Sequence, residues 1–248
     1  MLRRSTTLHQ PLVGAASALL LLLAAGCTSA AHTTATAQAT HAEPSPAGSA
    51  AASAPTSASA SAAPTTVAAP SSADIAKLVA DLPPAPADSK QFDDGKPEGA
   101  LTADQFVDGL FSPASQAKAH TTEAARGLQF AARRAWMSDT SAFVDIYLIR
   151  FATSKGAESF YDSRMTSDAA NFDANTSSAP QLPNSKVFVK TALDKYGNAL
   201  ARIYVQVGNT VITVYTASPA TPDKDTVSAL ALQAYHAVTA QQGAAATS

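Results

Sequence analysis

Cysteine is nearly absent from the 248-residue chain, which contains a single one, Cys27. One cysteine excludes an internal disulfide bond and any zinc or iron–sulfur site built from several cysteines. Charged residues are also scarce, at 15% of the sequence with a formal net charge of −2. A nucleic-acid-binding surface needs clustered lysine and arginine, so this composition argues against a nucleic-acid partner.

The motifs of common enzyme and cofactor sites are missing as well. The sequence has no His-Glu-x-x-His zinc motif, no Gly-x-Ser-x-Gly nucleophile motif and no glycine-rich phosphate loop. Residues 73–248 contain two histidines, His120 in a polar segment and His236 near the end of the last predicted helix. We therefore predict no catalytic residue, no metal ligand and no cofactor from the sequence.

The start of the chain has the pattern of an export signal. Arg3 and Arg4 precede an apolar stretch, residues 12–25, which is too short to cross a bilayer and is typical of a signal peptide. Its end, Ala24-Ala25-Gly26-Cys27, resembles the lipobox of bacterial lipoproteins, although Ala24 stands where that family usually has leucine. The resemblance implies cleavage before Cys27 and attachment of diacylglycerol, with acyl chains such as palmitate, to this cysteine. The protein would then be anchored in the cell membrane on its extracytoplasmic face. The alternative is an ordinary secretory signal with an incidental cysteine.

The sequence divides into three segments of different composition. Residues 1–27 are the predicted signal peptide. In residues 28–72, 39 of 45 positions are alanine, serine, threonine or proline, and no side chain is aromatic. Such a segment cannot bury enough apolar surface to offset the entropy lost on ordering, so we predict a disordered linker. Residues 73–248 are long enough to form a single domain with its own core.

Hydrophobic patterns and capping residues predict an α+β fold for residues 73–248, with an antiparallel sheet of about five strands packed by helices on one face. The order of elements is similar to that of small α+β domains on surface lipoproteins of high-GC Gram-positive bacteria. No functional residue follows from this similarity. The predicted elements are helices beginning near Ser72, Thr102, Ser154 and Thr221, and strands at 128–136, 142–151, 187–189, 200–207 and 210–216.

Two strands carry the polar residues of most interest. Strand 142–151 is apolar on both faces except for Asp145 and Arg150. Segment 128–136 alternates apolar and polar residues, which indicates a half-buried strand, although a helix opened by Thr122 is an alternative.

A candidate ligand-binding group follows if 128–136 is a strand. Arg134 and Trp136 then lie on one face of the sheet, and Tyr147 on the next strand could join them. A guanidinium beside an indole can receive a planar or anionic ligand. The alternative is that Trp136 belongs to the core and that Arg134 extends past it to solvent.

Together these observations favour a membrane-anchored extracytoplasmic lipoprotein that presents a non-catalytic binding or envelope-assembly domain on a flexible stalk. Its partners would be the membrane, through the lipid anchor at Cys27, and a component of the cell envelope. An extracytoplasmic hydrolase acting on a cell-envelope substrate is an alternative function. A structural spacer or a chaperone for envelope assembly is another.

Overall fold

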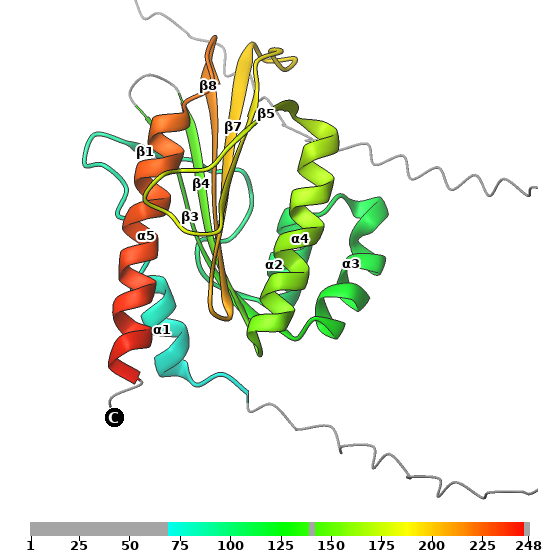
Figure 1. Ribbon diagram of the computed structural model, residues 1–248, viewed down its shortest axis with the longest axis vertical. Helices are drawn as coiled ribbons and strands as arrows, with labels where there is room; N and C mark the ends of the chain where they lie inside the picture. The colour runs from blue at the N-terminus through cyan, green and yellow to red at the C-terminus, as the bar shows by residue number, and fades with distance from the viewer. Residues whose placement is uncertain (1–68, 139–141, 246–248) are drawn as a thin grey trace, which may run out of the picture. The chain divides into compact units, whose positions relative to one another are not determined.

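The computed structural model of the protein describes residues 69–138 and 142–245. The predicted signal peptide, Cys27 and nearly all of the predicted linker lie outside the described residues. Within the described residues the predicted α+β class is confirmed, since five helices surround one antiparallel sheet (Figure 1). None of these helices is long and apolar enough to cross a membrane.

The sheet contains the five predicted strands and three short additional ones. Its order in space is β1-β3-β4-β8-β7-β6-β5, and β2 also pairs with β3. The additional strands lie at the two edges of the sheet, where backbone pairing holds them. Their sequences lack the alternation of apolar and polar residues from which a strand is predicted. The predicted strands are β3 (Leu128–Met137), β4 (Phe143–Phe151), β6 (Ser185–Lys190), β7 (Asn198–Val207) and β8 (Thr210–Pro219), and the additional ones are β1 (Lys90–Gln91), β2 (Gly99–Thr102) and β5 (Asp173–Ser177).

One helix was not predicted. α3 follows Ser112 with Pro113 at its first position, where proline fits well, but it buries few side chains and lacks a clear apolar stripe. The five helices are α1 (Ser72–Ala80), α2 (Ala103–Leu110), α3 (Pro113–Ala125), α4 (Ser154–Asn171) and α5 (Lys224–Ala245).

The helix starts agree closely with the predicted capping residues. The predicted start of α2 near Thr102 is confirmed, and Thr102 and Gln105 form a capping box in which each side chain accepts the other's backbone N–H. α1 is capped one residue earlier than predicted, by Ser71, whose hydroxyl accepts the backbone N–H of Asp74 at 3.1 Å. The Asp74 carboxylate in turn accepts the backbone N–H of Ser71, which completes a second capping box.

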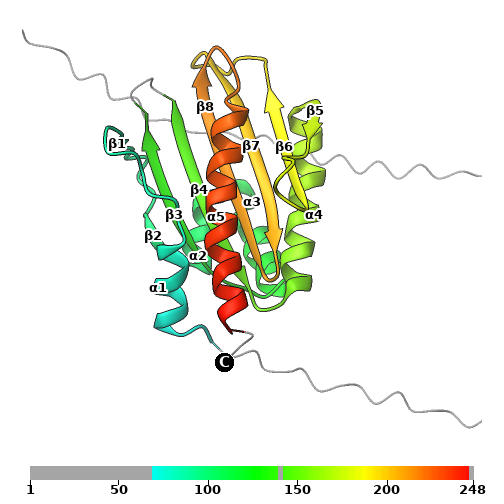
Figure 2. The same cartoon turned by 60° about the vertical axis from the view of Figure 1, so that its left-hand side comes forward.

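Helices cover both faces of the sheet, and the prediction of one covered face was wrong. α1 and α5 lie on one side, here called the α5 face, while α2, α3 and α4 lie on the other, the α4 face (Figures 1 and 2). Neighbouring residues of β4 belong to different cores: Ile146 faces α5, whereas Tyr147 belongs to the core under α4. A strand buried on both faces is apolar at nearly every position, as β4 is.

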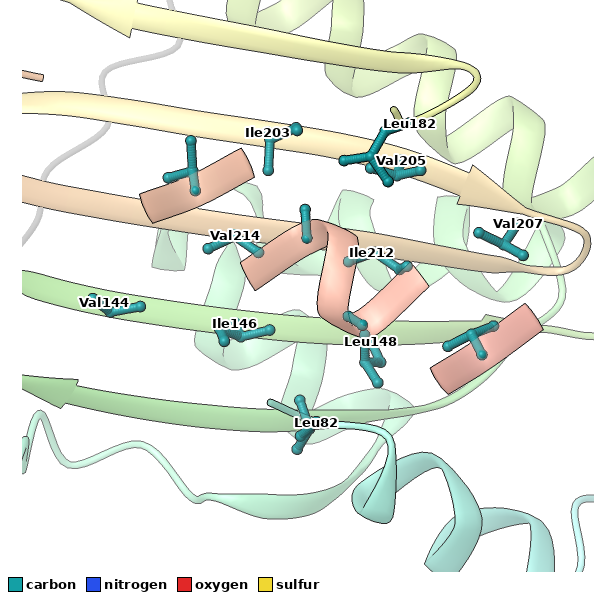
Figure 3. Close-up of a cluster of buried hydrophobic side chains, with 14 of the residues drawn as sticks. Leu82, Val144, Ile146, Leu148, Leu182, Ile203, Val205, Val207, Ile212 and Val214 are labelled. Atoms are coloured by element: carbon teal, nitrogen blue, oxygen red, sulfur yellow. The ribbon is translucent and has the colours of Figure 1, made fainter. Parts of the chain in front are cut away.

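The core on the α5 face consists mainly of aliphatic side chains from five adjacent strands, β3, β4, β8, β7 and β6. α5 presents small side chains to this layer, and its Ala231 and Ala234 have no exposed surface. Small residues at a contact allow a helix to approach its neighbour closely. The strand residues labelled in Figure 3 are Val144, Ile146, Leu148, Ile203, Val205, Val207, Ile212 and Val214.

Gly156, in the first turn of α4, allows this helix to lie against the end of α3. A Cβ atom at position 156 would collide with the backbone carbonyl oxygen of Arg126, which cannot move aside as a flexible side chain can. We therefore expect Gly156→Ala to lower the free energy of unfolding by about 1–3 kcal/mol, measured by urea denaturation.

Gly109 provides a matched control, because it lies within α2 and its added Cβ would meet only the Lys96 side chain at an ordinary 3.8 Å. Gly109→Ala should be neutral or stabilise the protein by up to about 1 kcal/mol, since alanine favours a helix. Equal effects of the two substitutions would contradict this account of how α4 packs.

Candidate functional site

The structure places two of the three predicted ligand-binding residues on one face of the sheet. Arg134 and Trp136 both point to the α5 face, as the strand pattern predicted. Trp136 is 3% exposed and belongs to the core. The Arg134 guanidinium donates from Nη1 to the backbone oxygens of Leu82 at 3.0 Å and Pro83 at 2.7 Å. Arg134 therefore holds the segment after α1 against the sheet.

Tyr147 does not join this pair, and its predicted grouping with Arg134 and Trp136 was wrong. The antiparallel register sets Tyr147 opposite Arg133, so its ring lies on the α4 face. The ring makes an edge contact with Phe106, with ring centroids 5.8 Å apart, and the Arg133 guanidinium lies 5.6 Å from the Tyr147 centroid. Directly opposite residues on paired strands share a face, which decides the neighbours of each side chain.

Arg133 is the centre of a buried charge network that the sequence reasoning missed. Its side chain is 1% exposed and donates to Asp145 from Nε at 2.9 Å and from Nη2 at 3.1 Å. It also donates to both carboxylate oxygens of Asp94, at 3.1 and 2.7 Å, and to the backbone oxygen of Lys96. The sequence did contain a signal for this network: Arg133 and Asp145 stand on neighbouring apolar strands, and buried charges require partners.

A second network of this kind ties α4 to the sheet. Asp168 is 2% exposed and accepts from Arg202 at 3.0 Å and from Arg164 at 3.3 Å. The Arg202 guanidinium also lies 4.9 Å from the ring centroid of Tyr215 and 5.4 Å from that of Phe172. Because these cations already contact carboxylates and aromatic rings of the domain, we interpret both networks as stabilising the folded structure and not as ligand sites.

The two histidines of the domain have structural surroundings. His120 is partly exposed and lies between Asp104 at 3.2 Å and Asp108 at 3.0 Å, so it joins α3 to α2 at the surface. His236 lies inside α5, which extends further than predicted, to Ala245. Neither histidine lines the cavity described next.

An open cavity of about 290 Å³ lies at one end of the sheet. It is formed where the start of α1, the end of α5 and the β7–β8 turn come together, an arrangement visible in Figure 2. Most of its wall is polar, and its charged side chains are two cations and one carboxylate. The lining residues are Ala69, Pro70, Asp74, Lys77, Gln129, Phe130, Arg150, Asn209 and Gln241.

Arg150 distinguishes this cavity from the two satisfied networks. Its one hydrogen bond to the described part of the chain runs from Nη1 to Asn209 Oδ1 at 2.8 Å. Its Nε is buried and has no partner in the part of the chain that the structure describes. Burial lowers the pKa of Arg150, and the negative charges of Asp74 and Asp81 oppose this shift without cancelling it. The cation is therefore only partly compensated by the domain.

Further polar atoms near Arg150 also lack partners within the described residues. Thr210 stands directly opposite Arg150 on the paired strand, and its hydroxyl is buried without a hydrogen bond. Asp81 accepts from Gln241 at 2.6 Å through Oδ1, but its Oδ2 is buried and unpaired. Burial raises the pKa of Asp81, against the effect of the Arg150 charge. Such a concentration of unsatisfied groups beside a cavity is typical of a binding site.

Comparisons with known proteins do not assign the chain to a family. No family model matches it, and no curated protein matches it. Among solved structures, it is similar to the extracellular domain of PknH from Mycobacterium tuberculosis, at 12% sequence identity and a TM-score of 0.40. That similarity covers 69% of this chain and 92% of the other. At this level of similarity no property of that domain is transferred to this one.

The burial of Trp136 leads to a stability prediction. Trp136→Ala should lower the free energy of unfolding by about 3–5 kcal/mol, because it removes a large side chain from the core on the α5 face. Trp136→Phe, which keeps most of the apolar contacts, should cost clearly less. Thermal or urea unfolding measures both, and a loss of only about 1 kcal/mol for Trp136→Ala would show that the indole is not part of a tight core.

The Arg133 network leads to a prediction about pH. Burial raises the pKa of Asp145 from its ordinary 3.8 to about 6, despite the opposing effect of Arg133. Between these two pH values the folded state retains a proton that the unfolded chain has released. Acidification from pH 7 to pH 4 should therefore stabilise the fold through this group, and the gain is lost as the pH rises through 6.

Urea unfolding at several pH values tests this prediction. In the unchanged protein, Asp145 should make the free energy of unfolding fall by up to about 1 kcal/mol per pH unit between pH 4 and 6. Asp145→Asn should remove this dependence on pH, since asparagine does not titrate. Asp88→Asn changes an exposed carboxylate in the loop after α1 and should leave the slope as it is. An unchanged slope in Asp145→Asn would contradict the assignment.

Proposed function

We propose that this protein is a lipid-anchored extracytoplasmic lipoprotein whose α+β domain binds a ligand without converting it. The anchor rests on the single cysteine, Cys27, which follows the apolar segment of the predicted signal peptide after Gly26. Two or more acyl chains on one residue bind a membrane far more stably than a single chain does. The proline- and alanine-rich residues 28–72 would then separate the domain from the membrane.

The binding role rests on the polar cavity around Arg150. Its lining presents hydrogen-bonding groups and charge, together with a partly compensated guanidinium. These are the groups that orient a small ligand in a preformed site. A component of the cell envelope is the natural source of such a ligand for a domain held at the membrane.

Near the cavity, the raised pKa of Asp81 is an observation in favour of the alternative of a hydrolase. A general acid or base must lie within hydrogen-bonding reach of the group that it protonates. Asp81 is absent from the cavity lining, and its Oδ1 accepts from Gln241, which is part of that lining. The geometry therefore supports binding better than it supports catalysis.

Replacing Cys27 tests the anchor. Cys27→Ser should move the protein from the membrane fraction to the soluble or secreted fraction and abolish labelling by radioactive palmitate, because serine offers no thiol for the lipid. Thr28→Ser, a conservative change at the next residue, should leave both results unchanged. If the Cys27→Ser protein remains on membranes after a salt wash, the lipid anchor is wrong.

A further inference from the structure

We infer that the cavity around Arg150 binds a small, singly charged organic acid, with its carboxylate on the Arg150 guanidinium and its apolar part against Phe130 and Pro70. This inference rests on the proposed binding function and names the class of ligand for that site. Three observations support it: the unused hydrogen-bond donors of Arg150, the hydrogen bond by which Asn209 fixes the guanidinium, and the charges and apolar surface around the cavity.

Arg150 has hydrogen-bonding capacity that the domain does not use. Apart from the bond of Nη1 to Asn209, neither Nε nor Nη2 donates to any described residue. Because Nε is buried, a ligand in the cavity would meet the terminal nitrogens Nη1 and Nη2, whose planar arrangement matches a carboxylate in two parallel hydrogen bonds. Asp74 and Asp81 act on this cation only at a distance, and a bound carboxylate would supply the directly hydrogen-bonded anion that no described residue provides.

Asn209 fixes the position of the guanidinium. Its Oδ1 accepts from Arg150 Nη1 at 2.8 Å, and its Nδ2 donates to the backbone oxygen of Phe151 at 2.8 Å. Both ends of the Asn209 amide are thus occupied, and the residue lies in the tight β7–β8 turn. The arginine is therefore oriented before any ligand arrives, which reduces the entropy lost on binding.

The remaining lining residues select the charge and shape of the ligand. Lys77, an exposed residue of α1, adds a second positive charge at the opening. The Asp74 carboxylate lines the same cavity and would repel a second negative charge on the ligand. Phe130 and Pro70 offer apolar surface. The site therefore favours a monocarboxylate over a dicarboxylate or a phosphate dianion.

The test compares four probes with the purified full chain: benzoate, its neutral analogue benzamide, succinate and inorganic phosphate. Binding is followed by isothermal titration and by NMR shifts of the Arg150 Nε–H and Asn209 amide signals. We expect benzoate to bind at least about tenfold more tightly than the other three, since hydrogen bonds to a charged group contribute most. Benzoate should also shift the Arg150 Nε–H signal.

Two variants assign the binding to the cavity. Arg150→Gln should weaken benzoate binding about tenfold or more, while Lys186→Gln removes an exposed charge from β6 and should leave it unchanged. If Arg150→Gln does not fold, Lys77→Gln replaces it, because this exposed side chain can be changed without disturbing the core. It should weaken benzoate binding a fewfold.

Each contrary result has a separate meaning. Equal binding of benzamide and benzoate, or unchanged affinity in both Arg150→Gln and Lys77→Gln, would overturn the organic-acid ligand but leave a binding domain in place. Tighter binding of phosphate or succinate would overturn the preference for a single charge. If none of the four probes binds, the inference fails, whereas the anchor at Cys27 is judged by fractionation alone.

Discussion

Both faces of the central strands are buried, and this burial governs every charged side chain that those strands carry. A charge placed between two apolar layers must find a partner within the domain, because water cannot reach it. Arg133 meets this requirement through Asp94 and Asp145, and Arg202 through Asp168. These ion pairs link the sheet to the loop that contains Asp94 and to α4.

Arg150 differs from these two arginines, because no described carboxylate is hydrogen-bonded to it. Arg133 uses its guanidinium for two carboxylates and a backbone oxygen, whereas Arg150 makes one hydrogen bond within residues 69–138 and 142–245, to a neutral amide. The two residues differ in their surroundings: Arg133 is covered by the loop containing Asp94, but Arg150 lies beside an open cavity at the end of the sheet. A cation without a full set of partners lowers the stability of the folded protein, because its desolvation is not repaid. Beside a ligand site the same cation can bind and orient an anionic ligand.

Much of the fold could be predicted because the information was local. The helix beginning near Thr102 and the five longer strands were confirmed. The edge strand β5, with the sequence Asp-Ala-Asn-Thr-Ser, was missed because it is held by backbone bonds. The candidate site was predicted less well, since Tyr147 was assigned to the wrong face of the sheet.

The sequence by itself determined the approximate starts of four of the five helices and of the five longer strands, because capping groups and apolar alternation act over a few residues. It also showed that Asp145 and Arg150 interrupt an otherwise apolar strand. Only the tertiary structure decided what those two residues contact. Asp145 meets an arginine on the next strand, while Arg150 lies in a cavity formed by segments as distant as Lys77 and Gln241. Contacts between such distant segments depend on strand register and helix packing, which no local pattern specifies.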